Sequence, residues 1–279
     1  MLKRLGFFVL AAALLLSLSP LAPQAAHAAD DNAAPAVSVT VDDHMQIYDP
    51  APVLRNGRTM VPLRSLFETL GATVLWEDAT RTVTALSYTA KGQIKLTLQV
   101  DNPIAYLNGN PLELDQPPTV IDDHTMVPLR LVSESLRAAV DWKENTQTVE
   151  IYSLNYQLFL SSLRGNVDLV TKELDLGANP NYRNPDRGDT PLIASVVLKR
   201  LDVVQLLLDN GADINAQASD GYSALLAAVS GQDVEMTKLL LKQGANPNLA
   251  SPKGTALQMA RQTQNQAEIN LLLAAGATE

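Results

Sequence analysis

Hydrophobic residues between positions 37 and 152 occur in short groups, which predicts short strands and short helices. One group has the i, i+3, i+4, i+7 spacing of an apolar helix face: Leu63, Leu66, Phe67 and Leu70. Residues 93–100 instead alternate between apolar and polar, as in a strand with one buried face. The Asn-Gly pair at 108–109 is a strong hairpin-turn signal. This part of the chain is therefore predicted to be a small α+β domain.

The pattern of this domain occurs twice. The hexapeptide TMVPLR fills residues 59–64 and again 125–130, and the match continues in the same register as far as residue 149. Each copy predicts a helix whose first residue is the proline, Pro62 or Pro128, because proline lacks the N–H that this position leaves unbonded. Two strands then follow in each copy, at 73–76 and 81–87 and at 139–142 and 147–152. The chain is also predicted to begin this domain with a hairpin over 37–48.

Paired charges and tryptophans in both copies invite a functional interpretation. Arg64 and Glu68, like Arg130 and Glu134, are four residues apart, so a local ion pair on each helix is the simpler explanation. The tryptophans that match between the copies are Trp76 and Trp142. Each ends a predicted strand beside an apolar helix, so core packing is favoured over a ligand platform.

These motifs resemble the N-terminal domain of copper amine oxidases, also called the stalk domain. The resemblance rests on residues 58–64, the Gly-Ala pair at 71–72, and residues 74–76 and 80–83, and it covers about 37–152. It implies an extracytoplasmic accessory module of Gram-positive-type surface proteins and not a catalytic domain.

A copper site would need more imidazoles than this chain offers. Its three histidines are His27, His44 and His124, and His27 lies in a predicted leader. The dipeptides at 43–44 and 123–124 are both Asp-His, yet their turn-like settings favour solvated loop residues over metal ligands. We therefore predict no metal, no cofactor and no enzymatic activity.

A different periodicity begins near residue 155. Gly-Ala pairs occur at 177–178, 211–212, 244–245 and 276–277, so the spacing is 34, 33 and 32 residues. The tripeptides TPL, SAL and TAL precede three of these pairs, at 190–192, 223–225 and 255–257. An apolar segment also precedes each Gly-Ala pair. This period resembles the ankyrin repeat, which implies about four repeats over 155–279 stacked into an all-α solenoid. The predicted fold class is thus multidomain, with a duplicated α+β stalk-type domain followed by an ankyrin solenoid.

Individual repeat residues have predictable mechanical roles. Thr190 can cap a helix that has Pro191 at its first position, and Gly211 can end a helix in the left-handed conformation. Asparagines after each Gly-Ala pair can satisfy backbone groups of the hairpins: Asn181, Asn215 and Asn248. The ankyrin family has histidine where this chain has Ile193, Leu226 and Gln258, so the capping bonds of that histidine must be replaced or missing.

Ankyrin arrays bind other proteins through hairpin tips and a concave helix face, and the resemblance implies the same use here. Carried onto this chain, the hairpin-tip candidates for partner binding are Tyr182, Arg183, Asp186, Arg187, Gln217, Asp220, Tyr222 and Lys253. Tyrosine and arginine are the residue types that most often dominate interface energetics. No linker rich in Gly, Ser or Pro separates the two domains, which favours a semi-rigid arrangement.

The N-terminus has the order of a secretory signal. Lys3 and Arg4 precede an apolar stretch over 5–18, and the Ala-His-Ala sequence at 26–28 offers a cleavage site. We expect a signal peptide at 1–28, a flexible N-terminus at 29–36, and no stable membrane insertion after cleavage. The protein is accordingly expected to be secreted or at the cell surface.

Composition adds two exclusions. The formal net charge of −9 disfavours binding to nucleic-acid phosphates, and the absence of cysteine excludes disulfides and thiolate chemistry. A non-catalytic protein-binding module therefore remains the favoured function. The alternative is a cell-envelope protein whose stalk-type domain binds peptidoglycan or another carbohydrate.

Overall fold

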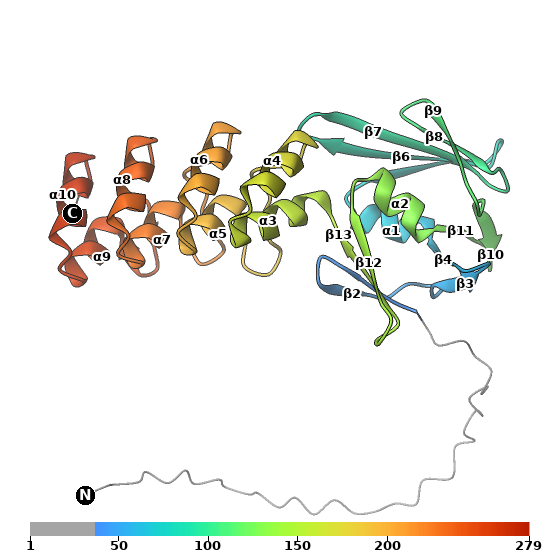
Figure 1. Ribbon diagram of the computed structural model, residues 1–279, viewed down its shortest axis with the longest axis horizontal. Coiled ribbons are helices and arrows are strands. Elements are labelled where there is room, and N and C mark those ends of the chain that lie inside the picture. Colours follow the sequence, from blue (N-terminus) through green and yellow to red (C-terminus); the bar gives the residue numbers. More distant parts are fainter. Residues whose placement is uncertain (1–36, 279) are drawn as a thin grey trace, which may run out of the picture. The chain divides into compact units, whose positions relative to one another are not determined.

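The computed structural model describes residues 37–278, so the expected signal peptide (1–28) and flexible N-terminus (29–36) lie outside the described residues. Figure 1 shows a β-rich region followed by helices that come in successive pairs. The predicted fold class, an α+β domain followed by a helical repeat array, is confirmed. Among residues 37–278, no helix has the length and apolar character needed to cross a bilayer.

The first domain consists of three sheets and two short helices. One sheet has the order β12 (Ala139–Lys143), β13 (Thr148–Tyr152), β1 (Ser38–Val41), β2 (His44–Gln46). A second has the order β10 (Thr119–Ile121), β11 (His124–Pro128), β4 (Arg58–Pro62), β3 (Val53–Arg55). The third has the order β5 (Thr73–Glu77), β6 (Thr82–Thr89), β7 (Gly92–Gln99), β8 (Ile104–Leu107), β9 (Asn110–Glu113). Helices α1 (Leu63–Thr69) and α2 (Leu129–Ser135) lie between the sheets (Figure 1).

The two copies of the duplicated motif meet at the centre of this domain. Strands β4 and β11 pair antiparallel with Val61 opposite Val127, and both valine side chains are fully buried. Since the two strands carry the same sequence, an antiparallel pairing centred on these valines gives each copy the same partner. Strand β1 also pairs in parallel with β13, with Val39 opposite Val149, which joins the start of the domain to its end. The duplication therefore builds one shared core.

The helices of the duplicated motif begin one residue later than predicted. Pro62 has φ −59° and ψ 119°, so it is still extended and pairs with Met126 in the sheet, and α1 begins at Leu63. Pro128 behaves in the same way before α2. The predicted apolar helix face is confirmed, since Leu66 and Phe67 are fully buried.

The prediction that both tryptophans pack in the core is wrong. Trp76 is 39% exposed and Trp142 is 43% exposed. The reason is topological: β5 and β12 are edge strands, so each tryptophan has a neighbouring strand on one side only. The indole N–H of Trp76 donates to the Asp78 carboxylate. Of the two predicted i,i+4 ion pairs, only Arg130–Glu134 forms within the described residues, at 3.7 Å.

The second domain is a stack of four helix pairs. These are α3 (Leu154–Arg164) with α4 (Val167–Asp175), α5 (Pro191–Val197) with α6 (Leu201–Asp209), α7 (Ala224–Ser230) with α8 (Val234–Lys242), and α9 (Ala256–Gln262) with α10 (Gln266–Ala274). A small hairpin of β14 (Ala250–Ser251) and β15 (Gly254–Thr255) precedes the last pair. One continuous apolar core runs through all four pairs, and it includes Leu158, Leu207, Leu240 and Leu272.

The helix caps replace the histidine that the ankyrin family places after TPL. Thr190 Oγ1 accepts the backbone N–H of Ile193 at 3.2 Å, with Pro191 at the first helical position as predicted. Ser223 caps α7 in the same way. In the last repeat Gln258 completes a capping box with Thr255. Each first helix is therefore capped without an imidazole.

The predicted asparagines bond to backbone groups, and their partners lie in the next repeat. Asn181 accepts the Asp213 backbone N–H at 2.6 Å and donates to the Gly211 carbonyl at 3.0 Å. Asn215 accepts from Asn246, and Asn248 accepts from Thr278, in the same manner. The asparagines thus fix the distance between successive repeats as well as the turn geometry.

Candidate functional site

The eight predicted partner-binding residues lie on three successive hairpins. Four of them follow α4, three follow α6, and one follows α8: Tyr182, Arg183, Asp186 and Arg187; Gln217, Asp220 and Tyr222; Lys253. Because the repeats stack in register, these hairpins form one edge of the array, which we call the hairpin edge.

Two of the eight residues link neighbouring hairpins. Arg183 Nη1 donates to the backbone carbonyl of Gln217 at 2.6 Å. The side-chain amide of Gln217 in turn donates to the Ala250 carbonyl of the following hairpin at 2.9 Å. These two side chains therefore align the hairpin edge, which leaves fewer of their polar atoms for a partner.

Tyr182 is half-buried at the end of an aromatic row. The row starts at Tyr152 in the last stalk strand and runs through Tyr156 and Phe159 of α3, with ring centroids 6.1–6.4 Å apart along it. Burial raises the pKa of the Tyr182 hydroxyl, so it remains a neutral hydrogen-bonding group. The row connects the stalk domain to the first hairpin.

The remaining candidates present charge on the hairpin edge. The Arg187 side chain is 73% exposed and lies 3.4 Å from Asp189. Asp220 is exposed and accepts the Tyr222 backbone N–H. The Lys253 ammonium lies 5.2 Å from the centre of the Tyr222 ring, a cation–π geometry. The edge thus alternates positive and negative groups and includes two half-buried tyrosines, Tyr182 and Tyr222.

Asp43 and His44 are exposed, as predicted, yet the Asp42–Asp43–His44 turn also forms hydrogen bonds to the ankyrin repeats. Asp42 accepts both the backbone N–H and the hydroxyl of Ser153, each at 2.7 Å, and Ser153 is the N-cap of α3. Asp43 accepts the Tyr156 hydroxyl at 2.5 Å, and His44 Nε2 lies 2.9 Å from Asp186. The turn therefore binds the stalk domain to the first ankyrin repeat.

The electrostatics of this turn follow from its contacts. Burial raises the pKa of the Asp42 carboxyl, although the bonds from Ser153 act in the opposite direction. The hydrogen bond to Asp186 raises the pKa of His44. A second Asp-Asp-His turn lies at 122–124, outside the 66-residue register of the duplication. Its His124 Nδ1 lies 2.7 Å from the Asp122 carbonyl, and its three residues are exposed. Of these two Asp-Asp-His turns, the one at 42–44 forms the hydrogen bonds to the first repeat.

The β6–β7 hairpin makes a second contact with the first repeat. The backbone N–H of Ala90 donates to the Gly177 carbonyl at 3.0 Å, and Lys91 lies 3.7 Å from Asp175. Gly177 has φ +93°, and a Cβ there would lie 2.8 Å from the Thr89 hydroxyl, so glycine is required by both conformation and space. The Arg137 guanidinium also donates to the carbonyl of Leu176 at the end of α4.

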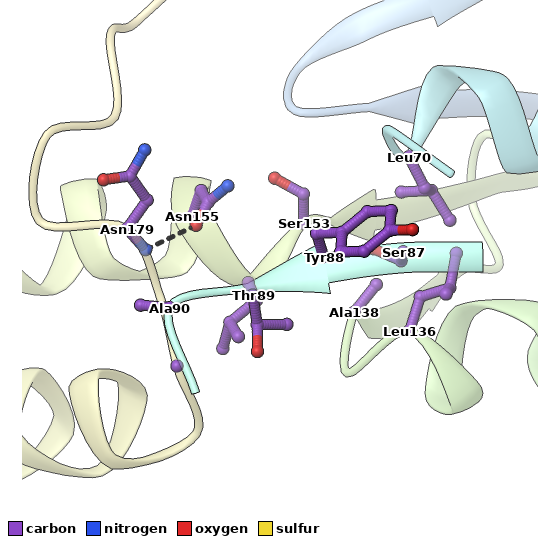
Figure 2. A pocket seen from close by; sticks show the side chains of 12 residues that line it. Leu70, Ser87, Tyr88, Thr89, Ala90, Leu136, Ala138, Ser153, Asn155 and Asn179 are labelled. Atoms are coloured by element: carbon purple, nitrogen blue, oxygen red, sulfur yellow. Dashed lines mark hydrogen bonds between the residues drawn. The ribbon is translucent and has the colours of Figure 1, made fainter. Parts of the chain in front are cut away.

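A cavity of about 300 Å³ opens between these contacts. Figure 2 shows Leu70, Leu136 and Ala138 at one end and Asn155 and Asn179 at the other. Leu70 and Leu136 occupy matching positions in the two copies, so the duplication supplies the apolar end while the first repeat supplies the polar end. Among the described residues that line the cavity, none has a charged side chain.

This junction was not predicted from the sequence. Serine is a common helix N-cap, but the residue that accepts the Ser153 hydroxyl hydrogen bond, Asp42, lies 111 residues earlier in the chain. The Asp-Asp-His sequence at 42–44 and 122–124 was a usable signal, because charged side chains in a turn often form hydrogen bonds to another part of the chain. Both aspartates nevertheless have similar positive φ angles in the two turns, and only the fold places one turn against α3. Within the described residues, no group of three or more His, Asp or Glu side chains is arranged to hold a metal ion.

Comparisons with known proteins agree with both resemblances. Residues 40–151 match the copper amine oxidase N-terminal domain, and residues 193–241 match the family described as ankyrin repeats (many copies). The chain is 38% identical over 60 residues to human SH3 and multiple ankyrin repeat domains protein 2, which covers 21% of this chain and 3% of that protein.

Two further relatives match the chain over similar lengths. An ankyrin repeat-containing protein of Schizosaccharomyces pombe is 34% identical over 68 residues, which is 24% of this chain and 32% of the relative. Human 2-5A-dependent ribonuclease is 42% identical over 59 residues, 21% of this chain and 8% of the relative. The chain thus spans about a third or less of each relative's length. The two family matches lie in the order that the sequence predicts, with the copper amine oxidase N-terminal domain over 40–151 followed by ankyrin repeats over 193–241.

Proposed function

We propose that this protein is a non-catalytic, extracytoplasmic binding module whose ankyrin repeats bind a protein partner along the hairpin edge. The stalk-type domain positions the repeats. The observation that carries the proposal is the aligned row of exposed charged side chains on three stacked hairpins, at Arg187, Asp220 and Lys253. Ankyrin repeats are a protein-interaction module, so a partner of complementary charge is the natural occupant.

The junction supports a positioning role for the stalk-type domain. A single residue, Ser153, separates β13 from α3, and the Asp42 and Asp43 carboxylates bond to the first repeat. Such contacts make the direction in which the hairpin edge faces depend on the stalk-type domain.

The test is a crosslinking pull-down from the secreted proteins of the native cell with the full chain as bait. A variant with Arg187→Ala, Asp220→Ala and Lys253→Ala removes three exposed charges and no helix contact. We expect it to lose the captured partner while keeping the wild-type melting temperature. The matched control, Arg81→Ala with Glu113→Ala, removes exposed charges from the stalk-type domain and should retain the partner. Equal capture by both variants would refute the hairpin edge as the binding surface.

Secretion is part of this proposal, and the N-terminal pattern of Lys3, Arg4 and the apolar stretch over 5–18 supports it. Sequencing the N-terminus of the protein from culture medium should give a start at residue 29. Recovery of the uncleaved chain from the cell interior would contradict secretion.

A second candidate function is cell-envelope binding through the stalk-type domain. The half-exposed Trp76 and Trp142 favour it, because exposed tryptophans on strand edges are suited to stacking on sugar rings. Sedimentation with purified cell walls tests this candidate. Wild-type protein should sediment and the Trp76→Ala, Trp142→Ala variant should stay in solution, whereas equal sedimentation would remove the role of the tryptophans.

A further inference from the structure

The two ends of each helix pair differ in chemistry. The hairpins lie at one end of the helices, so the turn within each pair lies at the opposite end, which we call the turn edge. In the first two repeats the turn edge exposes aliphatic side chains, with exposed fractions of 39–58%: Val167, Val197, Leu198 and Leu201.

The last two repeats show that the ankyrin fold does not require aliphatic residues at the positions of Val197 and Leu198, and the fourth repeat shows the same for Leu201. Measured back from each Gly-Ala pair, the positions of Val197, Leu198 and Leu201 are occupied in the third repeat by Ser230, Gly231 and Val234. In the fourth repeat they are occupied by Gln262, Thr263 and Gln266. Contiguous exposed apolar surface is unusual unless it binds something, so the difference between the repeats points to a function.

The aliphatic residues of the two repeats form one patch. Helix α4 packs against α6, and the side chain of Arg200 lies across the turn of the first repeat. A Cβ added to Gly165 would lie 2.6 Å from Arg200 Cδ. The two turns are therefore in direct contact, and Val167 lies beside the residues of the second repeat.

The patch is bordered by positive charge, although the whole chain has a formal net charge of −9. Arg164 and Arg200 are exposed, and neither forms an ion pair within the part of the chain that the structure describes. Lys199 pairs with Asp233 at 3.6 Å. Two nearby acids, Asp168 and Asp202, lie in the first turns of α4 and α6, where the helix N-termini stabilise them. Two arginines are thus left for an outside partner.

We propose that the turn edge of the first two repeats binds an amphipathic helix with an aliphatic face and acidic flanks. Residues seven apart on a helix lie on one face and about 10.5 Å apart along the axis, close to the ~8–10 Å between packed helices. One apolar face of such a helix therefore matches Val167 and Leu201 on neighbouring repeats, while its acidic flanks meet Arg164 and Arg200. The proposal rests on the protein-binding role of the repeats but uses a different edge.

Two synthetic helical peptides serve as probes. Both carry leucine with i, i+3, i+4, i+7 spacing, and the other positions are glutamate in one peptide and lysine in the other. Fluorescence anisotropy with the full chain should show binding of the glutamate peptide, weakened by salt. The lysine peptide should bind at least tenfold more weakly, despite the acidic net charge of the protein.

The decisive variant replaces Val197, Leu198 and Leu201 by the residues of the fourth repeat: Val197→Gln, Leu198→Thr and Leu201→Gln. Since the same fold accommodates these residues in the fourth repeat, the variant should fold, which a circular-dichroism melt checks. It should bind the glutamate peptide at least tenfold more weakly than wild type, and Arg164→Ala with Arg200→Ala should also weaken binding and reduce its salt dependence. The hairpin-edge variant Arg187→Ala, Asp220→Ala, Lys253→Ala should bind as wild type.

Three results would overturn the proposal. One is unchanged binding by the folded Gln-Thr-Gln variant, and another is equal affinity for the lysine peptide. The third is a concentration-dependent dimer that this variant abolishes, which would make a second copy of the chain the occupant. Loss of peptide binding in the hairpin-edge variant would instead show that the peptide binds at the hairpin edge. The experiment therefore distinguishes failure of this proposal from failure of the proposed function.

Discussion

Both domains of this chain are built by internal duplication, yet the copies are used in opposite ways. In the stalk-type domain, the copies of TMVPLR pair with each other at Val61 and Val127, and β1 pairs with β13 from the far end of the domain. In the ankyrin array, the asparagines of each repeat bond to the next repeat, as from Asn181 to Asp213. In the first duplication the two copies pair with each other, which we call a closed arrangement. In the second, each repeat contacts the next one along the stack, which we call an open arrangement.

The difference has consequences for stability and for function. A closed pair of copies shares one core, so damage to either copy destabilises the whole domain. An open stack depends on nearest neighbours, so each repeat can vary on its surface. The aliphatic turn edge of repeats one and two and the charged hairpin edge are two such variable surfaces.

The largest effect is expected for Phe67→Ala in the closed core. Phe67 is fully buried, and its loss should lower the free energy of unfolding by about 3–5 kcal/mol, measured by urea titration. Ser133 occupies the matching position in the second copy, so Ser133→Ala should lower it by only about 1 kcal/mol, through loss of its bond to the Leu129 carbonyl. Two separate unfolding transitions, one for each copy, would contradict the interpretation that the copies share one core.

A smaller effect is expected in the open stack at Glu173, which occupies the place of the core leucines Leu207, Leu240 and Leu272. Burial raises the pKa of Glu173 from 4.5 to about 7, although a hydrogen bond from Ser161 opposes the shift. The protonated form is therefore favoured in the fold. The resulting stabilisation is fully present below pH 4.5 and is lost as the pH rises to about 7.

Glu173→Leu should therefore raise the stability of the array at pH 8, by on the order of 2–3 kcal/mol, and by less at pH 4. Glu173→Gln should flatten the pH dependence between pH 4.5 and 7, as followed by thermal melts at several pH values. Glu144→Gln, at an exposed turn position of the stalk-type domain, is the control and should leave that dependence unchanged. An unaltered pH profile in Glu173→Gln would show that another group is responsible.

An effect of about 1–2 kcal/mol is expected at the junction between the two architectures. Asp42→Ala removes the acceptor of both Ser153 bonds at the start of α3 and should weaken the coupling of the domains. Asp122→Ala is a matched control. Asp42 and Asp122 have φ values of 51° and 47°, so placing alanine in this left-handed conformation causes similar backbone strain at both positions. Limited proteolysis near residue 153 should be faster in Asp42→Ala alone, and equal rates would argue against the coupling.

The smallest effect concerns the exposed charges that the two stalk copies share. Glu134→Ala removes the ion pair with Arg130, whose side chain is 71% exposed, and should lower the stability by no more than about 0.5 kcal/mol. Glu68→Ala should have still less effect. A loss above 1 kcal/mol from Glu134→Ala would assign that pair a role beyond the local helix.

The two duplications, most of the element types and the Thr190 helix cap could be predicted from the amino-acid sequence alone. These features depend on interactions within a few residues, such as Thr190 with Ile193, or on periodic apolar positions such as Leu63 and Leu66. Such local interactions and periodic patterns can be identified directly in the amino-acid sequence.

Which residues are exposed, and which form hydrogen bonds to distant parts of the chain, depends on tertiary packing and could not be predicted from the sequence. Trp76 and Trp142 are half-exposed because β5 and β12 lie at sheet edges, and strand order is not encoded in local pattern. Asp42 bonds to Ser153 while the identical turn at Asp122 remains in solvent, since only the first turn lies beside α3. Long-range packing sets the environment of each side chain, and residues with the same local sequence can therefore have different roles.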